Sequence, residues 1–332
     1  MRQKTIYVKV TERCNLQCQH CYAGCTKYGL DMSEDTVKTV INGLTTEFSQ
    51  NPDTLYDVIL HGGEPLLRPD YCEKIVQAFK PFKNVRMFIT TNLCVNLTSD
   101  ILKLLKTIHY VSTSFDTKIR FKTSEQLALW KANYFLLRET DADVQINTTL
   151  TKDFISERPY LRLRALNDFK ADSYHFERLS LQGRGSSVEI ASVDDVDNWL
   201  SECYEQNKQF GLKISMFEDL KTLAKGIKTC CFCRNCTSTK ITINADGTVA
   251  TCPNAYNTVI GMITNEGIAV NKQAYNLICL KERNRNPKCL GCEFYPYCNG
   301  DCFQQNWQNG KCAFPKKLFT SISKDLKNEK AV

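Results

Sequence analysis

Three cysteines stand close together near the start of the sequence, at the spacing C-x3-C-x2-C. Cys14, Cys18 and Cys21 follow a strand-like run from Ile6 to Val10. Thiolates are the usual ligands of iron–sulfur clusters, and a saturated four-iron cluster takes four of them. A set of three leaves one iron without a protein ligand, and an open position is what makes a metal site reactive. Cys25 is the nearest rival for a fourth ligand, so other parts of the sequence must decide.

A second and larger group of cysteines lies in the last third of the chain. Its members are Cys230, Cys231, Cys233, Cys236 and Cys252, followed by Cys289, Cys292, Cys298, Cys302 and Cys312. Pairs at the spacing C-x2-C are common in zinc sites as well as in iron–sulfur sites. Spacing alone therefore leaves both metals open for this region.

The composition limits what these cysteines can be. The chain has 332 residues, 18 cysteines and a net charge of +7. Disulfide scaffolds are short and follow a signal peptide, whereas this sequence opens without an apolar signal segment. No apolar run approaches the ~20 residues of a membrane span. The basic residues are spread out, without the density of a nucleic-acid footprint. We expect a cytoplasmic, metal-bearing protein with reduced thiols and neither a membrane nor a nucleic-acid partner.

Strand-like and helix-like segments alternate over the first 180 residues. Strands are expected near 6–10, 58–60, 85–91, 110–115, 144–150 and 174–180, with an amphipathic or capped segment after each. Six strand-then-helix units with apolar strands predict an α/β fold with a parallel sheet covered by helices. Six units suit a partial (β/α)6 barrel better than a complete barrel of eight. An open doubly wound sheet is the alternative that the same pattern allows.

Polar and thiol side chains follow several of the expected strands at the point where each strand ends. In both architectures ligands bind at the carboxyl ends of parallel strands. The three cysteines follow the first strand and Gly62 to Pro65 follow the second. The later strands contribute Asn92, Ser114, Asp116 and Asn147. Each residue alone has a simpler explanation as a turn or cap, but their common position predicts one ligand site.

The segment CNLQCQHC, followed one strand later by HGGEP, resembles the radical S-adenosylmethionine (SAM) superfamily. The resemblance implies that Cys14, Cys18 and Cys21 hold a 4Fe–4S cluster whose fourth iron binds SAM. It leaves Cys25 as a spare thiol. The cofactor then supplies the difficult chemistry: one electron enters the sulfonium and a 5′-deoxyadenosyl radical forms. That radical abstracts a hydrogen from a substrate.

The same resemblance assigns the SAM contacts. Gly62 and Gly63 let the backbone approach the ligand closely, and the Glu64 carboxylate pairs with the SAM amino group. His20 lies beside the adenine and Ser114 contacts the carboxylate. The weaker assignments by this resemblance are Asn92, Asp116 and Asn147.

The C-terminal cysteines resemble the SPASM domain attached to radical SAM enzymes, through Cys236-x10-Gly247-x4-Cys252 and a later C-x2-C-x5-C-x3-C run. This resemblance implies two auxiliary 4Fe–4S clusters with interleaved ligands. The first set is Cys230, Cys236, Cys252 and Cys302, and the second is Cys289, Cys292, Cys298 and Cys312. Cys231 and Cys233 compete with Cys230, and the spacing from Cys302 to Cys312 is shorter than usual. Four cysteines per cluster leave no open iron, which favours electron transfer or structural support.

The sequence divides into four expected parts. Residues 1–185 form the radical SAM partial barrel and residues 186–228 form a linking helical region. Residues 229–320 form the SPASM domain, with a β-hairpin over 240–251, and residues 321–332 form a tail. The pair Asp246-Gly247 between strand-like flanks is typical of a hairpin turn.

Enzymes of this architecture mostly modify peptides or proteins, so we expect crosslinking, epimerisation or oxidation of a ribosomally made peptide. One implied partner is a flavodoxin- or ferredoxin-type electron donor. Because no leader-binding domain is expected before the barrel, we also expect either a separate recognition protein or direct docking of the peptide on the barrel. Sulfatase-maturing members carry an aspartate base after the hairpin cysteine, where this sequence has Pro253. No catalytic acid or base is named by the sequence. The alternatives are a small-molecule dehydrogenase and a zinc-holding interaction module.

Overall fold

The computed structural model describes residues 2–116, 119–227, 229, 232, 236–255, 257–302, 305 and 307–329. Three of the cysteines considered above, Cys230, Cys231 and Cys233, lie outside the described residues. Within the described part the strands form one ten-stranded sheet, in the order β10-β9-β8-β7-β1-β2-β3-β4-β5-β6. The first six strands and the last four belong to different stretches of the sequence, and the sheet joins them.

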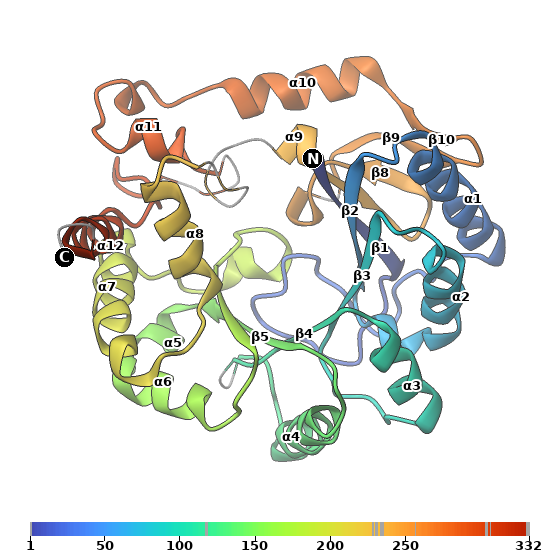
Figure 1. The fold of residues 1–332 in the computed structure, drawn as a ribbon, viewed down its shortest axis with the longest axis horizontal. Helices are drawn as coiled ribbons and strands as arrows, with labels where there is room; N and C mark the ends of the chain where they lie inside the picture. Colours follow the sequence, from blue (N-terminus) through green and yellow to red (C-terminus); the bar gives the residue numbers. More distant parts are fainter. Residues whose placement is uncertain are drawn as a thin grey trace.

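Six parallel strands form the N-terminal half of this sheet. They are β1 (Arg2–Thr11), β2 (Thr54–Gly62), β3 (Val85–Thr91), β4 (Tyr110–Ser114), β5 (Val144–Leu150) and β6 (Ser173–Arg178). Each strand pairs in parallel with the next one along the chain. A doubly wound sheet would reverse its strand order at a switch point, and this order does not reverse. The predicted partial barrel is therefore confirmed, and Figure 1 shows its helices ringing the strands.

Helices follow the strands in the predicted alternation. They are α1 (Glu34–Gln50), α2 (Pro69–Phe79), α3 (Ser99–Thr107), α4 (Ser124–Arg138), α5 (Lys152–Ile155), α6 (Pro159–Asn167) and α7 (Val193–Phe210). Ser33 caps α1 by accepting a hydrogen bond from the backbone of Thr36, as helix N-caps do. The expected helix over 155–169 is instead two helices. Pro159 explains the break, because it lacks a backbone N–H and sits at the first turn of α6.

The two faces of the barrel strands carry different side chains. Ile6 and Val8 of β1 are fully buried beneath the helices, whereas Tyr7 between them points to the inside. Strand side chains alternate between faces, so neighbours in register share a layer. The innermost layer runs through Tyr7, Ile59, Phe88 and Tyr110, which are successive partners across four strands. An apolar floor thus closes one end of the barrel interior.

The C-terminal region extends the sheet at the edge of β1. Strand β7 (Lys240–Ile243) pairs in parallel with β1, and β8 (Thr248–Ala250), β9 (Val259–Thr264) and β10 (Gly267–Val270) follow in antiparallel order. The hairpin expected over 240–251 is therefore present, and Gly247 at its turn has a positive φ of 83°. The sequence did not predict that this hairpin joins the barrel sheet.

Shorter elements and the last helices complete the described chain. The 3-10 turns are η1 (Pro65–Leu67), η2 (Gly183–Ser187), η3 (Pro253–Ala255) and η4 (Pro287–Cys289). The remaining helices are α8 (Ser215–Ala224), α9 (Cys236–Thr239), α10 (Lys272–Arg283), α11 (Tyr295–Cys298) and α12 (Lys316–Glu329). Residues assigned to a C-terminal tail thus continue α12, which packs on α7 and α8. No described helix is long and apolar enough to cross a bilayer.

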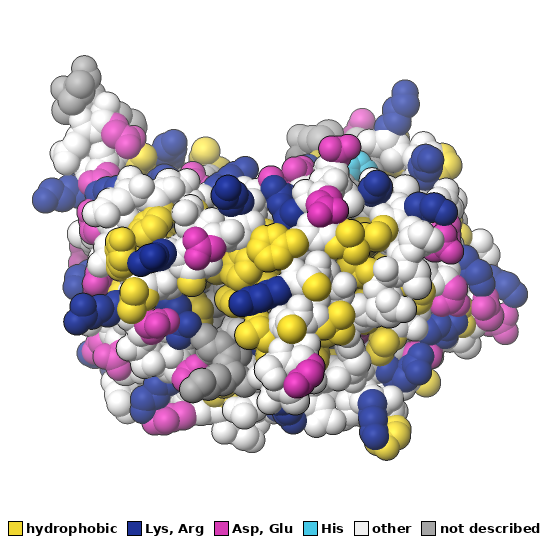
Figure 2. All heavy atoms as spheres, turned by 90° about the horizontal axis from the view of Figure 1, so that it is seen from below, with side chains coloured by type: hydrophobic (Ala, Val, Ile, Leu, Met, Phe, Trp, Pro, Cys, Tyr) yellow, Lys and Arg dark blue, Asp and Glu magenta, His cyan; other side chains and the backbone are white. Residues whose placement is uncertain are grey.

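Helix α4 carries apolar side chains on its outer face as well as its inner face. Trp130 and Tyr134 are fully buried against the barrel, whereas Phe135 is 50% exposed and Leu129 is 40% exposed. Figure 2 shows apolar side chains gathered on this side of the molecule, with lysines and arginines between them. This patch lies on the outside of the barrel and is separate from the interior cavity.

Candidate active site

A cavity of about 550 Å³ occupies the barrel interior above the apolar floor. Its walls come from the inner faces of β1 to β6, from the loop after β1, and from Pro253 and Asn254 of η3. The predicted site residues in its lining are Cys14, Cys18, His20, Cys21, Gly62, Gly63, Asn92, Ser114 and Asn147. Two predicted residues, Glu64 and Asp116, are absent from the lining.

The loop that carries the three cysteines is held by backbone hydrogen bonds from several directions. The amide of Cys14 donates to the carbonyl of Thr26 at 2.9 Å, within the loop. Arg184 of η2 donates from Nε to the carbonyl of Cys18 and from Nη1 to that of Cys25, both at 2.9 Å. Its own amide donates to the carbonyl of Cys21. The turn η2, which spans the boundary predicted at residue 185, therefore acts as a clamp on the cysteine loop.

The glycine pair after β2 has a role that the sequence did not reveal. Gly62 has a φ of +137°, and a Cβ there would collide with the carbonyl oxygen of Thr11. A Cβ on Gly63 would collide with the carbonyl oxygen of Arg13. The amide of Gly63 donates to Thr11 at 2.8 Å. Both glycines thus let the end of β2 pack directly against the cysteine loop, while their backbones still line the cavity.

Glu64 is fully buried and its carboxylate is already engaged. Oε1 accepts from the amide of Leu66 at 3.0 Å and from the Thr91 hydroxyl at 2.7 Å, and Oε2 accepts from the amide of Asn92 at 2.6 Å. Burial raises the pKa of Glu64 to about 7 against the opposing effect of these hydrogen bonds. In the structure this side chain ties η1 to the end of β3. Its pairing with a SAM ammonium group remains a prediction.

His20, Asp116 and Arg120 form a buried network beside Cys18. Arg120 donates from Nε to Asp116 at 2.6 Å, and His20 Nε2 lies 3.2 Å from the same carboxylate. Burial alone would raise the pKa of Asp116, but Arg120 and His20 outweigh it and hold that pKa at about 2. Asp116 therefore positions its neighbours instead of facing the cavity. Arg120 also contacts the Cys18 sulfur at 3.6 Å.

The sequence analysis missed Arg120 and Arg184. Both lie far along the chain from the cysteines that they contact, at separations of 102 and 166 residues. No spacing motif connects them with the cysteines, so only the folded barrel reveals the contact. The one usable signal was that each follows the carboxyl end of a strand, where ligand sites form.

Two asparagines, Asn92 directly after β3 and Asn147 on β5, also line the cavity. Asn92 donates to Asn15 at 2.9 Å and contacts the Cys14 sulfur at 3.6 Å. Asn147 donates to the hydroxyl of Ser112 at 2.7 Å, but its buried Oδ1 has no partner among the described residues. Ser114 pairs in register with Asn147 across β4 and β5. An acceptor without a donor inside a cavity is the feature expected where a polar ligand binds.

These residues fit the cofactors that the sequence implies. The three cysteines line one cavity, and buried unpartnered atoms of Asn147 and His20 face the space beside them. Among the described residues no three histidine, cysteine or carboxylate groups converge on a single metal ion. In a four-iron cluster each thiolate binds a different iron, so wider separation of the sulfurs is expected. A hydrogen bond with Cys25 lowers the pKa of the Cys21 thiol to about 5, which places the predicted spare thiol directly beside a predicted ligand.

A second cavity, of about 170 Å³, lies in the C-terminal region. Its lining includes Cys289, Cys292, Cys298 and Cys312, the four residues predicted to hold one auxiliary cluster. They come from η4, the following turn, α11 and the segment before α12. Despite the short spacing before it, Cys312 lines the same cavity as the other three. This donor set fits a four-iron cluster.

The other predicted cluster set is only partly described. Burial and the nearby thiols of Cys252 and Cys302 raise the pKa of Cys236 to about 12, so these three cysteines share one neighbourhood. The fourth member, Cys230, lies outside the described residues. A cluster bound by this set therefore stays a prediction, as does the choice of Cys230 as its fourth ligand.

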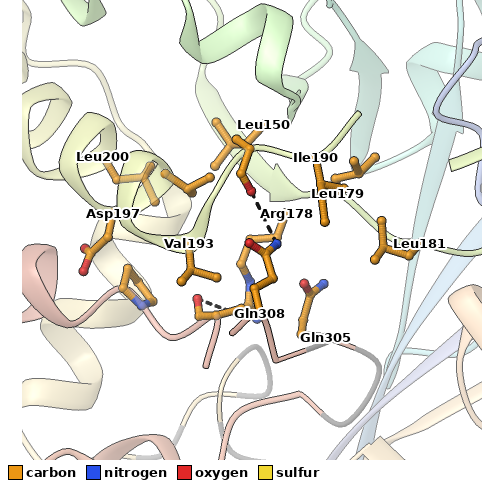
Figure 3. Close-up of a pocket in the computed structure, with 14 residues that line it drawn as sticks. Leu150, Arg178, Leu179, Leu181, Ile190, Val193, Asp197, Leu200, Gln305 and Gln308 are labelled. Carbon is orange, nitrogen blue, oxygen red and sulfur yellow. Dashed lines mark hydrogen bonds between the residues drawn. The ribbon is translucent and has the colours of Figure 1, made fainter. Parts of the chain in front are cut away.

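Arg178 at the end of β6 links the barrel to the second cysteine cavity. It donates to Asp301 at 2.6 and 3.0 Å, and both side chains are nearly buried. Asn299, Gly300 and Asp301 all have positive φ, so the ion pair holds an unusual backbone. Figure 3 shows Arg178 in a separate apolar pocket of about 60 Å³, where Gln308 donates to the carbonyl of Ala191. No cysteine is among the described residues lining that pocket.

Comparison with known families identifies the N-terminal half of the site. Residues 8–117 match the family model described as the radical SAM superfamily. The chain carries a radical SAM domain. The matched range includes the cysteine loop, the glycine pair and the ends of β1 to β4. A sequence relative, an AdoMet-dependent haem synthase from Methanosarcina barkeri, is 28% identical over 214 residues, covering 62% of this chain and 59% of that protein.

A second relative from the same organism, an Fe-coproporphyrin III synthase, is 27% identical over 197 residues, covering 56% of this chain and 47% of that protein. The chain thus spans about half of the length of these curated relatives. The radical SAM domain is therefore similar to theirs over part of each protein.

Solved structures resemble the whole described chain in fold. One structure of anSMEcpe, with bound AdoMet and a Kp18Cys peptide, has a TM-score of 0.77 and 15% identity, covering 98% of both chains. SuiB from Streptococcus suis, bound to the precursor peptide SuiA, has a TM-score of 0.66 and 17% identity, covering 91% of this chain and 72% of that one. At these identities the likeness establishes the fold, including the C-terminal extension of the barrel.

Proposed function

We propose that this protein is a radical SAM enzyme that abstracts hydrogen from a peptide or protein substrate. The carrying observation is the barrel cavity, in which three cysteines and the glycine pair line one wall together with unpartnered polar atoms. The fold likeness to two proteins solved with bound peptides supports a peptide substrate. The cavity is partly open to solvent.

Within this proposal, Cys14, Cys18 and Cys21 hold the 4Fe–4S cluster, and SAM lies between the glycine pair, His20, Ser114 and Asn147. When bound, the cluster and SAM supply the electron and the radical. The chain's own residues orient the cofactor and the substrate and shield them from solvent. Arg120 and Asn92 each donate to a ligand sulfur, and such hydrogen bonds tune the potential of iron–sulfur clusters.

We further propose that the C-terminal region is a SPASM domain with two auxiliary 4Fe–4S clusters. The convergence of Cys289, Cys292, Cys298 and Cys312 on one cavity supports the second cluster. Four thiolates per cluster leave no open iron, so their role is to move electrons or stiffen the region. A flavodoxin- or ferredoxin-type donor supplies electrons, and a separate recognition protein is compatible with the leader of a precursor peptide.

A second candidate function is a reaction on a small molecule. Two sequence relatives favour it, because they are named as an AdoMet-dependent haem synthase and an Fe-coproporphyrin III synthase. These matches cover only part of each relative, and the fold likeness that spans the whole chain is to structures with peptides. SAM cleavage that proceeds at full rate without any peptide would favour the small-molecule reaction.

The proposal is tested by anaerobic co-expression with each small open reading frame beside the gene, followed by peptide mass spectrometry. A loss of two hydrogens from one peptide would establish a crosslinking or oxidising maturase. An unchanged mass with deuterium at one α-carbon, after reaction in heavy water, would establish epimerisation. No change in any peptide, with SAM still cleaved, would overturn the peptide assignment.

A further inference from the structure

His61 is the residue before the glycine pair, and the assignments above give it no task. It lines the cavity from the end of β2, in register with Lys9 of β1. Its imidazole is held between two aromatic rings, with Tyr7 edge-on at a centroid distance of 5.7 Å and Tyr22 at 6.3 Å. The ring therefore has a fixed orientation inside the cavity wall.

One ring nitrogen of His61 is satisfied and the other is not. Nε2 lies 3.2 Å from the hydroxyl of Tyr22, whereas the buried Nδ1 has no hydrogen-bond partner among the described residues. His175, in the same cavity lining, differs because its Nδ1 lies 2.6 Å from the hydroxyl of Ser215. His20 Nδ1 also lacks a partner among the described residues, but His20 already has a predicted contact with the cofactor, whereas His61 has none.

The contact with Tyr22 favours one tautomer of His61. The Tyr22 hydroxyl has no other hydrogen-bond partner among the described residues, and its hydrogen finds an acceptor only if Nε2 accepts it, so we infer the tautomer that accepts at Nε2. Burial, helped by the charge of Lys9, lowers the pKa of His61 to about 3, so the imidazole is neutral at working pH. A neutral imidazole that accepts at Nε2 carries its proton on Nδ1. The cavity wall therefore presents one N–H donor without an acceptor.

An unsatisfied donor in a buried wall is costly unless a ligand supplies the acceptor. We propose that Nδ1–H of His61 donates a hydrogen bond to a carbonyl oxygen of the peptide backbone and thereby holds the substrate next to the cofactor. This inference rests on the proposed function. A peptide offers a carbonyl at every residue, so the contact fixes the backbone without selecting a side chain. Because Gly62 and Gly63 follow His61 directly, the held carbonyl lies at the cysteine end of the cavity.

The C-terminal region adds two residues of η3 to the cavity wall. Pro253 contributes a rigid surface that offers neither a proton donor nor an acid, and Asn254 contributes a polar side chain beside it. Tyr22 acts as a positioning residue, since it reaches the substrate only through the imidazole.

The test measures binding of the precursor peptide that changes mass in the co-expression experiment, by anaerobic calorimetry on the holoenzyme saturated with SAM. His61→Phe keeps a planar ring but removes the donor, and should raise the peptide Kd by about 3- to 10-fold. His61→Asn places an amide N–H near the position of Nδ1 and should recover much of that loss. It also keeps the test open if the Phe variant does not fold. His109→Phe, a matched change on an exposed histidine outside the cavity lining, should leave the peptide Kd unchanged.

The outcomes separate this inference from the proposed function. An unchanged peptide Kd in His61→Phe would overturn the contact while leaving the peptide reaction intact. A larger loss of SAM affinity than of peptide affinity would assign the acceptor to the cofactor and would also overturn it. If no peptide changes mass at all, the proposed function fails and the peptide contact fails with it.

Discussion

At the scale of single residues, two arginines and one asparagine support the cysteines that are predicted to hold iron. Arg120 and Asn92 contact the sulfurs of Cys18 and Cys14, and Arg184 holds the backbone of the same loop. The cysteines therefore rest in a preformed frame of donors. The donors follow three different strands, β3, β4 and β6, so the frame exists only after the barrel has formed.

Removing one cysteine of this set should remove the cluster. We predict that Cys18→Ala loses the iron of one cluster and abolishes formation of 5′-deoxyadenosine, because two remaining thiolates do not hold a four-iron cluster. Iron content and product analysis after anaerobic purification provide the measurement. Cys279→Ala, a half-buried cysteine of α10 outside all predicted ligand sets, is the matched control. Full activity in Cys18→Ala would refute the assignment.

The buried Glu64 predicts a dependence of stability on pH. Its pKa is about 7 in the folded protein and near its ordinary value of 4.5 when the chain is unfolded. Between these values the folded state holds one more proton, so the free energy of unfolding should fall as pH rises, by up to about 1.4 kcal/mol per pH unit, and level off above pH 7. Glu64→Gln removes the titration, and its amide NH₂ then faces the N–H of Asn92. Anaerobic chemical denaturation of both proteins between pH 5 and pH 8 measures the difference, and parallel curves would contradict it.

The residue scale also shows where prediction from sequence stopped. The cysteines and glycines were recognised because their spacing is local. Asp116 and Glu64 were expected to contact SAM, yet both are buried and bonded to protein groups. A sequence shows that a carboxylate follows a strand but not which way it turns. His61 carries no spacing signal of its own, since its unpartnered nitrogen exists only in the folded cavity.

At the scale of elements, η2 connects the last barrel strand with the loop after the first. Gly185 lies at its centre, and a Cβ there would collide with the carbonyl oxygen of Ser180. Strand and helix positions in the barrel were predictable, because alternation of apolar runs and helix caps is a local property. The clamp by η2 was not predictable, since a run of glycine and serine looks the same in a free linker and in a packed turn.

The clamp gives a prediction for Gly185→Ala. The collision should destabilise the protein by about 1 to 3 kcal/mol and loosen the cysteine loop, so less iron should be retained after gel filtration. Gly291→Ala is the matched control, because a Cβ at Gly291 meets no atom within 4 Å. Thermal unfolding and iron content measure the two effects. Equal melting temperatures for the two variants would exclude a structural role for this turn.

At the scale of the whole molecule, the barrel and the cysteine-rich region are joined by the sheet and by the pair of Arg178 with Asp301. The sequence predicted a boundary near residue 185 and a separate SPASM domain. It could not predict the pairing of β7 with β1, because contacts between strands more than 200 residues apart leave no local pattern. The overall likeness to solved structures covers both regions together.

The ion pair between the regions predicts a strong effect of its disruption. Arg178→Met leaves Asp301 buried without its partner, which typically costs about 3 to 5 kcal/mol, and should release iron bound by Cys298 and its neighbours. The more exposed pair of Arg138 and Asp172 serves as a control, since Arg138→Met should cost under about 1 kcal/mol. Denaturation curves and iron content compare the two. A similar loss in both variants would show that burial of the Arg178 pair does not matter.

The central place of β1 in the sheet has a consequence for synthesis of the chain. Strand β1 pairs with β2 on one side, and within the described residues its other side is covered by β7, which begins at Lys240. During most of translation β1 therefore keeps an open edge that can pair with other chains. A nascent barrel that still lacks β7 is therefore prone to aggregation. Slow translation of the residues from Lys240 onward should thus lower the yield of folded protein before any cofactor is inserted.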